Sequence, residues 1–205
     1  SDAESVGEVR IVAGSDGNIT VMWSANSGLK AKTFMDSLYW GTTETLETQA
    51  YGDELVASPD GGVTAAYGAD IAGGNHVVRL LTRPAGSSTF SSEGTDLNPS
   101  AGSQWAPNLA YNASGDGVLT WGTDIGSNHD RVLAARYDHA TDTWSAAAPL
   151  PAETDDVRGD CLAIDNSGNA AYVWGTGEVP NGGGASHVFG ASMSPDGTWS
   201  SATVL

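Results

Sequence analysis

Two stretches of the sequence carry the same polar residue types in a similar order, and those types can hold a small polar ligand. One runs Gly-Ala-Asp-Ile-Ala-Gly-Gly-Asn-His and the other Gly-Thr-Asp-Ile-Gly-Ser-Asn-His, while a third retains only Ser-His. Their carboxylate, amide and imidazole groups supply the placed hydrogen bonds that orient a sugar or a metal ion. The alternative is that they only stabilise turns through bonds to nearby backbone. The candidate ligand-binding residues are Asp70, Asn75, His76, Asp124, Asn128, His129 and His187.

Three large planar side chains occupy an equivalent position, four residues before an aligned leucine in three successive repeats. They are Tyr51, Trp105 and Arg158. Aromatic rings pack on the C–H face of a pyranose, while neighbouring amides and carboxylates bind its hydroxyls. These residues therefore join the predicted ligand-binding set, the alternative being that they pack on adjacent structure.

One short segment also offers oxygen ligands to a metal ion. Asp124, Asn128 and Asp130 fall close together, and carboxylate and amide oxygens are the ligands that calcium prefers. The segment predicts a calcium site, although its spacing matches no established calcium-binding loop. Paired cysteines, the His-Glu-x-x-His motif and a Ser-His-Asp pattern are absent, and no motif selects a carboxylate pair. We therefore predict no catalytic residue from the sequence, and no cofactor other than calcium.

These polar segments recur because the chain repeats itself four times. Each repeat contains a short apolar stretch, a turn with glycine and a second apolar stretch that ends in an aromatic residue; the turns and their flanks lie at 11–23, 55–67, 109–121 and 162–174. A further aromatic residue follows in a polar setting, at Trp40, Phe90, Trp144 and Trp199. A period of about 50 residues made only of short strands and turns is typical of propeller-like repeat folds.

We therefore predict an all-β fold, a β-propeller of four four-stranded blades, whose strands are named A to D within each blade. The whole chain, 1–205, forms a single domain with repeat units at about 6–47, 48–99, 100–152 and 153–205. The alternative is half of a larger ring completed by a second chain, which would make a homodimer. Helices are not expected, because 27 glycines are spread along the chain and no stretch has sustained helical spacing of apolar residues.

The composition excludes two classes of partner. The chain has 25 acidic and 8 basic residues and a formal net charge of −17, which repels nucleic-acid phosphates and anionic membrane surfaces. The single cysteine, Cys161, cannot form a disulfide within the chain and is expected to be a small buried core residue. The eight recurring aromatic residues are likewise expected to pack between blades.

The repeat pattern resembles the tryptophan-bearing repeats of secreted bacterial β-propellers, and the Asp-box repeats of sialidase-like propellers. The nearest match to an Asp-box is Ser194-Pro-Asp-Gly-Thr-Trp199, which is shorter than the usual motif. An Asp-box is a structural turn without catalytic meaning. The resemblance implies a propeller fold and a secreted, extracellular location. A sialidase would need a cluster of arginines around its substrate, and only six arginines are present.

The sequence favours a non-enzymatic, lectin-like recognition module over an enzyme. Its ligand-binding face would be formed by the B–C loops and the D–A connections, since binding residues tend to lie on loops that a rigid scaffold displays. The expected partner is a carbohydrate or another protein surface, with glycans preferred. The first alternative is a propeller-fold glycoside hydrolase or sialidase-like enzyme, and the second is a structural or assembly unit.

Overall fold

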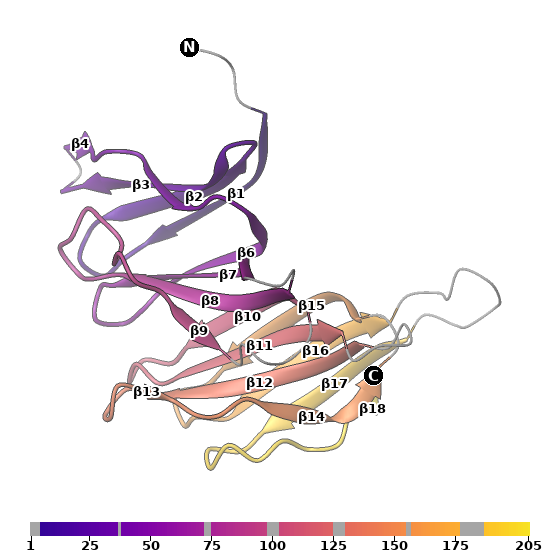
Figure 1. The fold of residues 1–205 in the computed structure, drawn as a ribbon. Helices are drawn as coiled ribbons and strands as arrows, with labels where there is room; N and C mark the ends of the chain where they lie inside the picture. Colours follow the sequence, from indigo (N-terminus) through magenta and orange to yellow (C-terminus); the bar gives the residue numbers. More distant parts are fainter. Residues whose placement is uncertain are drawn as a thin grey trace. The chain divides into compact units, whose positions relative to one another are not determined.

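The computed structural model describes residues 5–36, 38–71, 75–97, 103–124, 130–154, 157–176 and 187–205. These residues form antiparallel β-strands joined by turns, and no helix occurs among them (Figure 1). The described part of the chain accordingly offers no helix with the length and hydropathy needed to cross a membrane. The chain divides into two compact units, Ser1–Pro99 with Trp105–Pro107, and Ser100–Gln104 with Asn108–Leu205.

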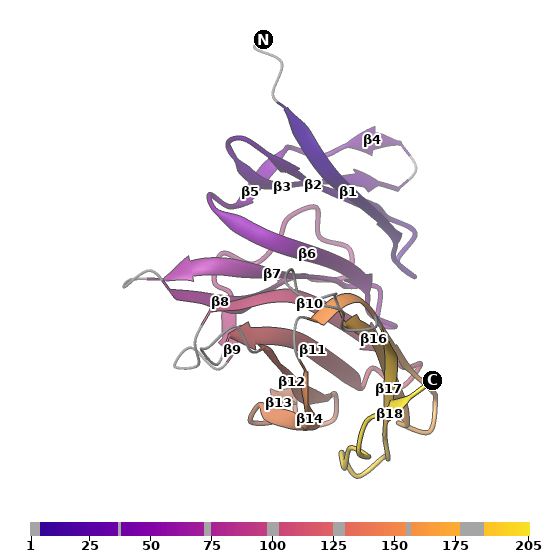
Figure 2. The same cartoon turned by 90° about the vertical axis from the view of Figure 1, so that its right-hand side faces the viewer.

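The first unit holds two sheets, which run through strands in sequence order (Figure 2). The strands of the first sheet are β1 (Val6–Ala13), β2 (Ile19–Ala25), β3 (Gly28–Met35), β4 (Tyr39–Trp40) and β5 (Glu44–Glu47). Those of the second sheet are β6 (Ala50–Ala57), β7 (Val63–Ile71), β8 (Asn75–Arg83) and β9 (Thr95–Leu97).

The second unit holds two more sheets of the same construction. The strands of the third sheet are β10 (Gln104–Tyr111), β11 (Gly117–Asp124), β12 (Asp130–Asp138), β13 (Thr143–Trp144) and β14 (Ala148–Thr154). Those of the fourth sheet are β15 (Val157–Ile164), β16 (Ala170–Thr176), β17 (Val188–Met193) and β18 (Thr203–Val204). Residues 105–107 of β10 cluster with the first unit.

Each sheet has four strand positions, and the outermost position is interrupted in the first, third and fourth sheets. In the first sheet β4 pairs with the end of β3, and β5 pairs with β3 near its start. In the third sheet β13 and β14 pair with β12 in the same way. The fourth sheet has an isolated bridge between Met193 and Trp199 before β18. The predicted all-β fold with four blades of four strands is therefore confirmed.

Apolar side chains fill the space between the two sheets within each unit. In the first unit Met22, Leu29 and Ala31 of the first sheet cluster with Leu55, Tyr67, Val77 and Leu81 of the second. In the second unit Val132, Ala134 and Leu150 of the third sheet cluster with Tyr172, Trp174 and Ala191 of the fourth. Strand β7 is buried from Val63 to Ala69, on both faces. That two-sided burial explains why the sequence lacks a clear alternation of apolar and polar residues.

Four of the eight recurring aromatic residues are buried as predicted, while Trp23, Trp144 and Trp199 are half-buried. Tyr67, Trp121 and Trp174 are at most 1% exposed and Phe90 is 8% exposed, whereas Trp40 is 50% exposed. The prediction of burial was wrong for Trp40, because its ring packs against Phe34 of its own sheet, with centroids 5.2 Å apart. It was also wrong for Cys161, which is exposed. Strand alternation turns Leu162 inward and Cys161 outward.

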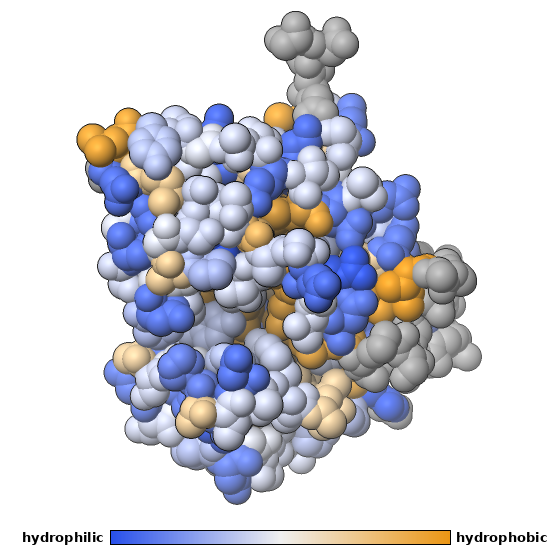
Figure 3. All heavy atoms as spheres, turned by 60° about the vertical axis from the view of Figure 1, so that its left-hand side comes forward, coloured by the Kyte–Doolittle hydropathy of each residue, from blue (hydrophilic) through white to orange (hydrophobic). Residues whose placement is uncertain are grey.

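Hydrophilic residues dominate the molecular face drawn in Figure 3, where apolar residues appear singly or in small groups. Such a surface fits the formal net charge of −17 and favours solubility.

The A–B turns share one backbone geometry. In each, the first residue donates a backbone hydrogen bond to the carbonyl four residues later, as in Gly14 to Asn18 and Ser58 to Gly62. The fourth position is a glycine with positive φ: Gly17, Gly61, Gly115 and Gly168. The segment that resembles an Asp-box has the same geometry at Ser194–Thr198, with Gly197 at a φ of 88°. It is a structural turn.

Replacing Gly61 by alanine is expected to cost more stability than replacing Gly17. Both have positive φ, which costs an L-residue about 1–2 kcal/mol. A Cβ at Gly17 would meet nothing within 4 Å, whereas one at Gly61 would lie 3.0 Å from the backbone nitrogen of Asp16. We expect about 1 kcal/mol for Gly17→Ala and about 3 kcal/mol for Gly61→Ala in urea unfolding. Equal losses would contradict the close approach at Gly61.

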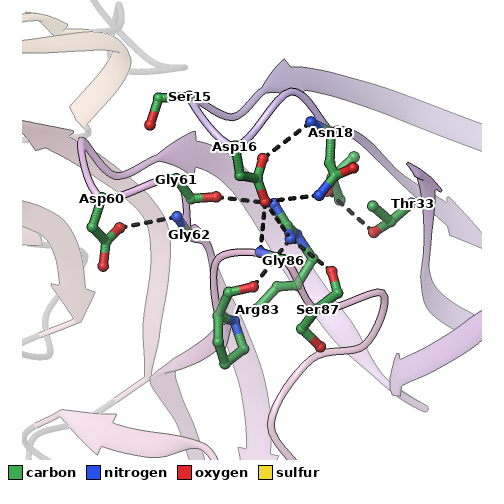
Figure 4. Close-up of polar contacts among 12 residues, drawn as sticks. Ser15, Asp16, Asn18, Thr33, Asp60, Gly61, Gly62, Arg83, Gly86 and Ser87 are labelled. Atoms are coloured by element: carbon green, nitrogen blue, oxygen red, sulfur yellow. Dashed lines mark hydrogen bonds and ion pairs between the residues drawn. The ribbon is translucent and has the colours of Figure 1, made fainter. Parts of the chain in front are cut away.

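A buried arginine joins the turns of the first unit (Figure 4). The side chain of Arg83 is 0% exposed, and its Nη1 lies 3.1 Å from Asp16 Oδ2. The same guanidinium donates to the carbonyls of Ser87 at 2.7 Å and Gly61 at 3.2 Å. The Gly86 amide donates to Asp16 Oδ2 at 2.9 Å. Arg83 therefore links the A–B turn of the first sheet to the turns of the second.

Candidate functional site

The first strand of the second sheet contains a β-bulge. The register of β6 with β7 shifts between Tyr51 and Asp53, and Gly52 between them has a φ of 51°. A Cβ on Gly52 would lie 3.0 Å from the backbone nitrogen of Ala106, itself a non-glycine residue with a φ of 49°. Bulges re-aim side chains and are common beside active sites, and strained φ values also concentrate there.

Three carboxylates and one arginine gather just beyond this bulge. Asp53 and Glu54 follow it on β6, and β1 contributes Glu8 and Arg10. Arg10 Nη2 lies 3.0 Å from Glu8 Oε1, and Arg10 Nε donates to the Asp53 carbonyl at 3.1 Å. The side chain of Glu8 is 56% exposed and that of Arg10 is 33% exposed. One guanidinium thus joins β1 to β6 and leaves a carboxylate accessible to solvent.

The two carboxyl groups on β6 have environments that favour their protonated forms. Burial raises the pKa of Asp53, and the charge of Arg10 only partly offsets this. Its Oδ2 is buried without a hydrogen-bond partner among the described residues. Burial also raises the pKa of Glu54, which is half-buried; Arg10 lowers it, and the charges of Asp53 and Glu8 raise it further. Carboxyl groups placed in contrasting environments are suited to opposite acid–base roles.

An aromatic and polar cluster joins the start of β6 to the neighbouring strands β7 and β8. Asp70 and His76 are directly paired across β7 and β8, and Asp70 Oδ1 contacts His76 Nδ1. The Tyr51 hydroxyl donates to Asp70 Oδ2 at 3.4 Å, and its ring lies 4.7 Å from the His76 ring, edge-on. Tyr51 is 44% exposed. The structure thus brings together three of the residues predicted from the sequence.

Of the predicted ligand-binding residues that the structure describes, all but His187 lie in strands, and for these the prediction of a loop position was wrong. Asp70 and His76 belong to the paired ends of β7 and β8, because the B–C connection is a hairpin whose ladder continues outward. Tyr51 and Trp105 likewise lie within β6 and β10, and Trp105 is half-buried.

The remaining predicted residues are more scattered or lie outside the description. Asp124 is exposed at the end of β11 and pairs in register with Asp130 of β12; His187 is exposed. Asn128 and His129 lie outside the described residues, as do the side chains of Asn75, Asp130 and Arg158. Where side chains are described, no three His, Cys, Asp or Glu residues form a group that could hold a metal ion. The calcium site remains a prediction.

The carboxylates at the bulge were missed by the sequence analysis. A signal was present, because Asp53 and Asp160 both stand two residues before an aligned leucine. In the second unit, Asp160 Oδ2 accepts hydrogen bonds from Asn108 Nδ2 at 2.7 Å and the Tyr172 hydroxyl at 2.5 Å. Those bonds occupy Asp160 within the structure. The equivalent Asp53 has an oxygen without a hydrogen-bond partner in the described part of the chain. The two aspartates therefore differ in whether their carboxyl oxygens are already hydrogen-bonded.

Comparison with known proteins shows similarity in structure only. No protein-family model and no curated protein sequence matches the chain. An α-L-arabinofuranosidase from Fusarium graminearum has a TM-score of 0.66 at 15% identity, over 98% of this chain and 66% of that one. An endo-arabinase from Bacteroides thetaiotaomicron has a TM-score of 0.59 at 13% identity, over 100% and 82%. A polysaccharide lyase, an ulvan lyase, has a TM-score of 0.69 at 10% identity, over 95% and 57%.

At these identities the likeness concerns the fold, and this chain spans between 57% and 82% of the three neighbours. All three are carbohydrate-cleaving enzymes, as is a thermostable family-43 glycoside hydrolase with a TM-score of 0.61 at 11% identity, over 97% of this chain and 72% of that one. This finding corrects the expectation that the chain is a non-enzymatic recognition module and more likely not an enzyme, and it favours the enzyme alternative.

Proposed function

We propose that the chain is a carbohydrate-cleaving enzyme, a glycoside hydrolase, with its active site at the bulge of β6. The observation that carries the proposal is the contrast between Glu54 and Glu8. Glu54 is half-buried with a raised pKa, whereas Glu8 is exposed and ion-paired with Arg10. Glycoside hydrolysis requires such a pair, one carboxylic acid and one carboxylate. The enzymatic activities of the structural neighbours support the same reaction class.

In the proposed reaction Glu54 gives its proton to the glycosidic oxygen as the bond to the anomeric carbon breaks. Glu8 provides the second carboxylate, as a base toward water or as a nucleophile, and water supplies the new hydroxyl on the anomeric carbon. With Glu8 as base, the water proton goes to Glu8, and exchange with solvent restores both groups. With Glu8 as nucleophile, Glu54 takes the proton of the water that cleaves the glycosyl-enzyme ester and so regains its starting state. Asp53 lies next to Glu54 on β6, and in its ionised form its charge helps to raise the pKa of Glu54.

The surroundings of the site favour a neutral polysaccharide. The net charge of −17 and the exposed carboxylate of Glu8 repel polyanions such as uronic-acid polymers. Tyr51 lies three residues before Glu54 on the same strand, so its exposed ring is available to stack on a neighbouring sugar unit. Asp70 accepts a hydrogen bond from the Tyr51 hydroxyl and also contacts His76, and both residues offer polar atoms to sugar hydroxyls.

A panel of polysaccharides tests the proposal. The purified chain is incubated with arabinan, xylan, ulvan and polygalacturonate, and both reducing ends and the ultraviolet absorbance of unsaturated sugars are followed. We expect reducing ends to appear with a neutral polymer, without the unsaturated product. Binding without any product would contradict an enzyme, and unsaturated products from the acidic polymers would identify a lyase instead. Early NMR spectra of the product anomer decide between base and nucleophile for Glu8.

A further inference from the structure

The first unit contains a cavity of about 620 Å³ whose lining does not include Glu8, Arg10, Asp53 or Glu54. Its walls come from β5 of the first sheet, from β7 and β8 of the second, and from residues 90–94 between β8 and β9. The volume lies within the range of about 300–1,000 Å³ that is usual for ligand pockets. The cavity borders the outer strand position of the first sheet. One of its lining residues, Tyr67 of β7, pairs in register with Asp53 at the bulge, so the two sites are neighbours on the second sheet.

Two side chains that line this cavity each carry a buried polar atom without a hydrogen-bond partner among the described residues. Tyr67 is 0% exposed, and its hydroxyl is one such atom. Glu44 carries the other: its Oε2 accepts a hydrogen bond from the Phe90 amide at 3.1 Å, while its Oε1 is buried and unbonded. A buried polar atom without a partner costs about 1–3 kcal/mol, so a ligand that satisfies both atoms would recover that free energy.

The charges around the cavity exclude anions. Arg79 is its only cation among the lining residues, and it is already bound by Glu47 at 2.8 Å and by Asp96 at 2.6 Å. Glu44 and Glu93 add two further acids to the lining. Burial raises the pKa of the Glu44 carboxyl and so favours its protonated, uncharged form. An uncharged carboxyl suits a neutral ligand better than an exposed carboxylate does.

The remaining lining matches a carbohydrate. Leu46, Leu81 and Phe90 form an apolar wall, and Thr45 and Ser91 add hydroxyl groups. Sugars present just this combination, with C–H faces that pack on apolar and aromatic groups and hydroxyls that both donate and accept. We propose that this cavity is a second, non-catalytic site for a neutral sugar of mono- or disaccharide size. It does not depend on the proposed hydrolase activity.

Two conservative variants test the proposal by calorimetry and thermal unfolding. The probes are xylose, arabinose and xylobiose as neutral sugars, ethanolamine as a cation and inorganic phosphate as an anion. We expect a neutral sugar to bind the wild-type chain and to raise its Tm. Tyr67→Phe and Glu44→Gln should each weaken that binding by about tenfold or more, since each removes or alters a buried hydrogen-bonding atom. Tyr137→Phe, in the second unit, is the matched control and should bind like the wild type.

The same variants separate this site from the bulge of β6. Without sugar, Tyr67→Phe should be as stable as the wild type or more so, because it removes an unsatisfied buried hydroxyl. Both variants should retain whatever polysaccharide cleavage the wild type shows, while Glu54→Gln should retain sugar binding at this cavity. Unchanged sugar affinity in both variants would overturn the proposal, as would binding of ethanolamine or phosphate but of no neutral sugar.

Discussion

Replacing Glu54 by glutamine is expected to lower kcat on a neutral polysaccharide by a factor of about 10²–10⁴. The amide keeps the size of the side chain but has no proton to give to the leaving oxygen, and general acid catalysis contributes about that factor. The half-buried position of Glu54 and its raised pKa mark it as the acid. Asp36→Asn, which alters an exposed acid of the same unit, is the matched control and should leave kcat unchanged.

The choice of substrate distinguishes loss of an acid from loss of structure. An aryl glycoside with an acidic phenol as leaving group needs little protonation, so Glu54→Gln should lose far less activity on it than on the polysaccharide. The pH dependence has a definite sign. Because the acid must be protonated, the wild-type rate should fall as pH rises through the raised pKa of Glu54, and the variant should lack that limb. An equal loss on both substrates would contradict the acid role.

Replacing Arg83 by methionine is expected to destabilise the chain by about 3–5 kcal/mol. The change leaves Asp16, whose side chain is 10% exposed, without its counter-ion, and removal of one partner from a buried ion pair costs about that much. It also deprives the carbonyls of Ser87 and Gly61 of their donors. Urea unfolding measures the loss.

Arg136→Met is the matched control, because Arg136 occupies the aligned position of the next repeat. Its side chain is 31% exposed, and its Nη2 lies 4.0 Å from Asp116 Oδ2. Exposed pairs contribute about 1 kcal/mol or less, so this variant should lose far less stability than Arg83→Met. Similar losses in the two variants would show that burial of Arg83 is not what stabilises the turns.

The same pair gives stability a pH dependence. Burial alone would raise the pKa of Asp16, but hydrogen bonds from Gly86, Asn18 and Arg83 lower it from 3.8 to about 2. A depressed carboxyl pKa stabilises the fold above the unfolded-state value, and that contribution is lost as pH falls from about 4 toward 2. The free energy of unfolding of Asp16→Asn should therefore depend less steeply on pH in this window than that of the wild type. An identical slope would contradict the depressed pKa.

Local pattern was enough to predict the strands, the turns and the number of sheets. Each A–B turn contains a glycine because its fourth residue has a positive φ, as observed at Gly17, Gly61, Gly115 and Gly168. Apolar runs such as Val63 to Ala69 indicate strands buried on both faces. These features depend on residues close in sequence. The lengths of the strands depend on pairing, which is why the hairpin of β7 and β8 extends through residues that the sequence indicated as loop.

The candidate site could not be predicted from local sequence pattern. Glu8 and Arg10 are ordinary charged residues in the sequence, as are Asp53 and Glu54, among 25 acids. Their significance arises when β1 lies against β6, so that Arg10 reaches the Asp53 carbonyl and burial changes the pKa of both β6 carboxyls. The amino-acid sequence by itself determined a repeated all-β architecture, because turn chemistry and apolar periodicity act locally. Only tertiary structure decided which carboxylates are desolvated and paired, because desolvation depends on residues far apart in the chain.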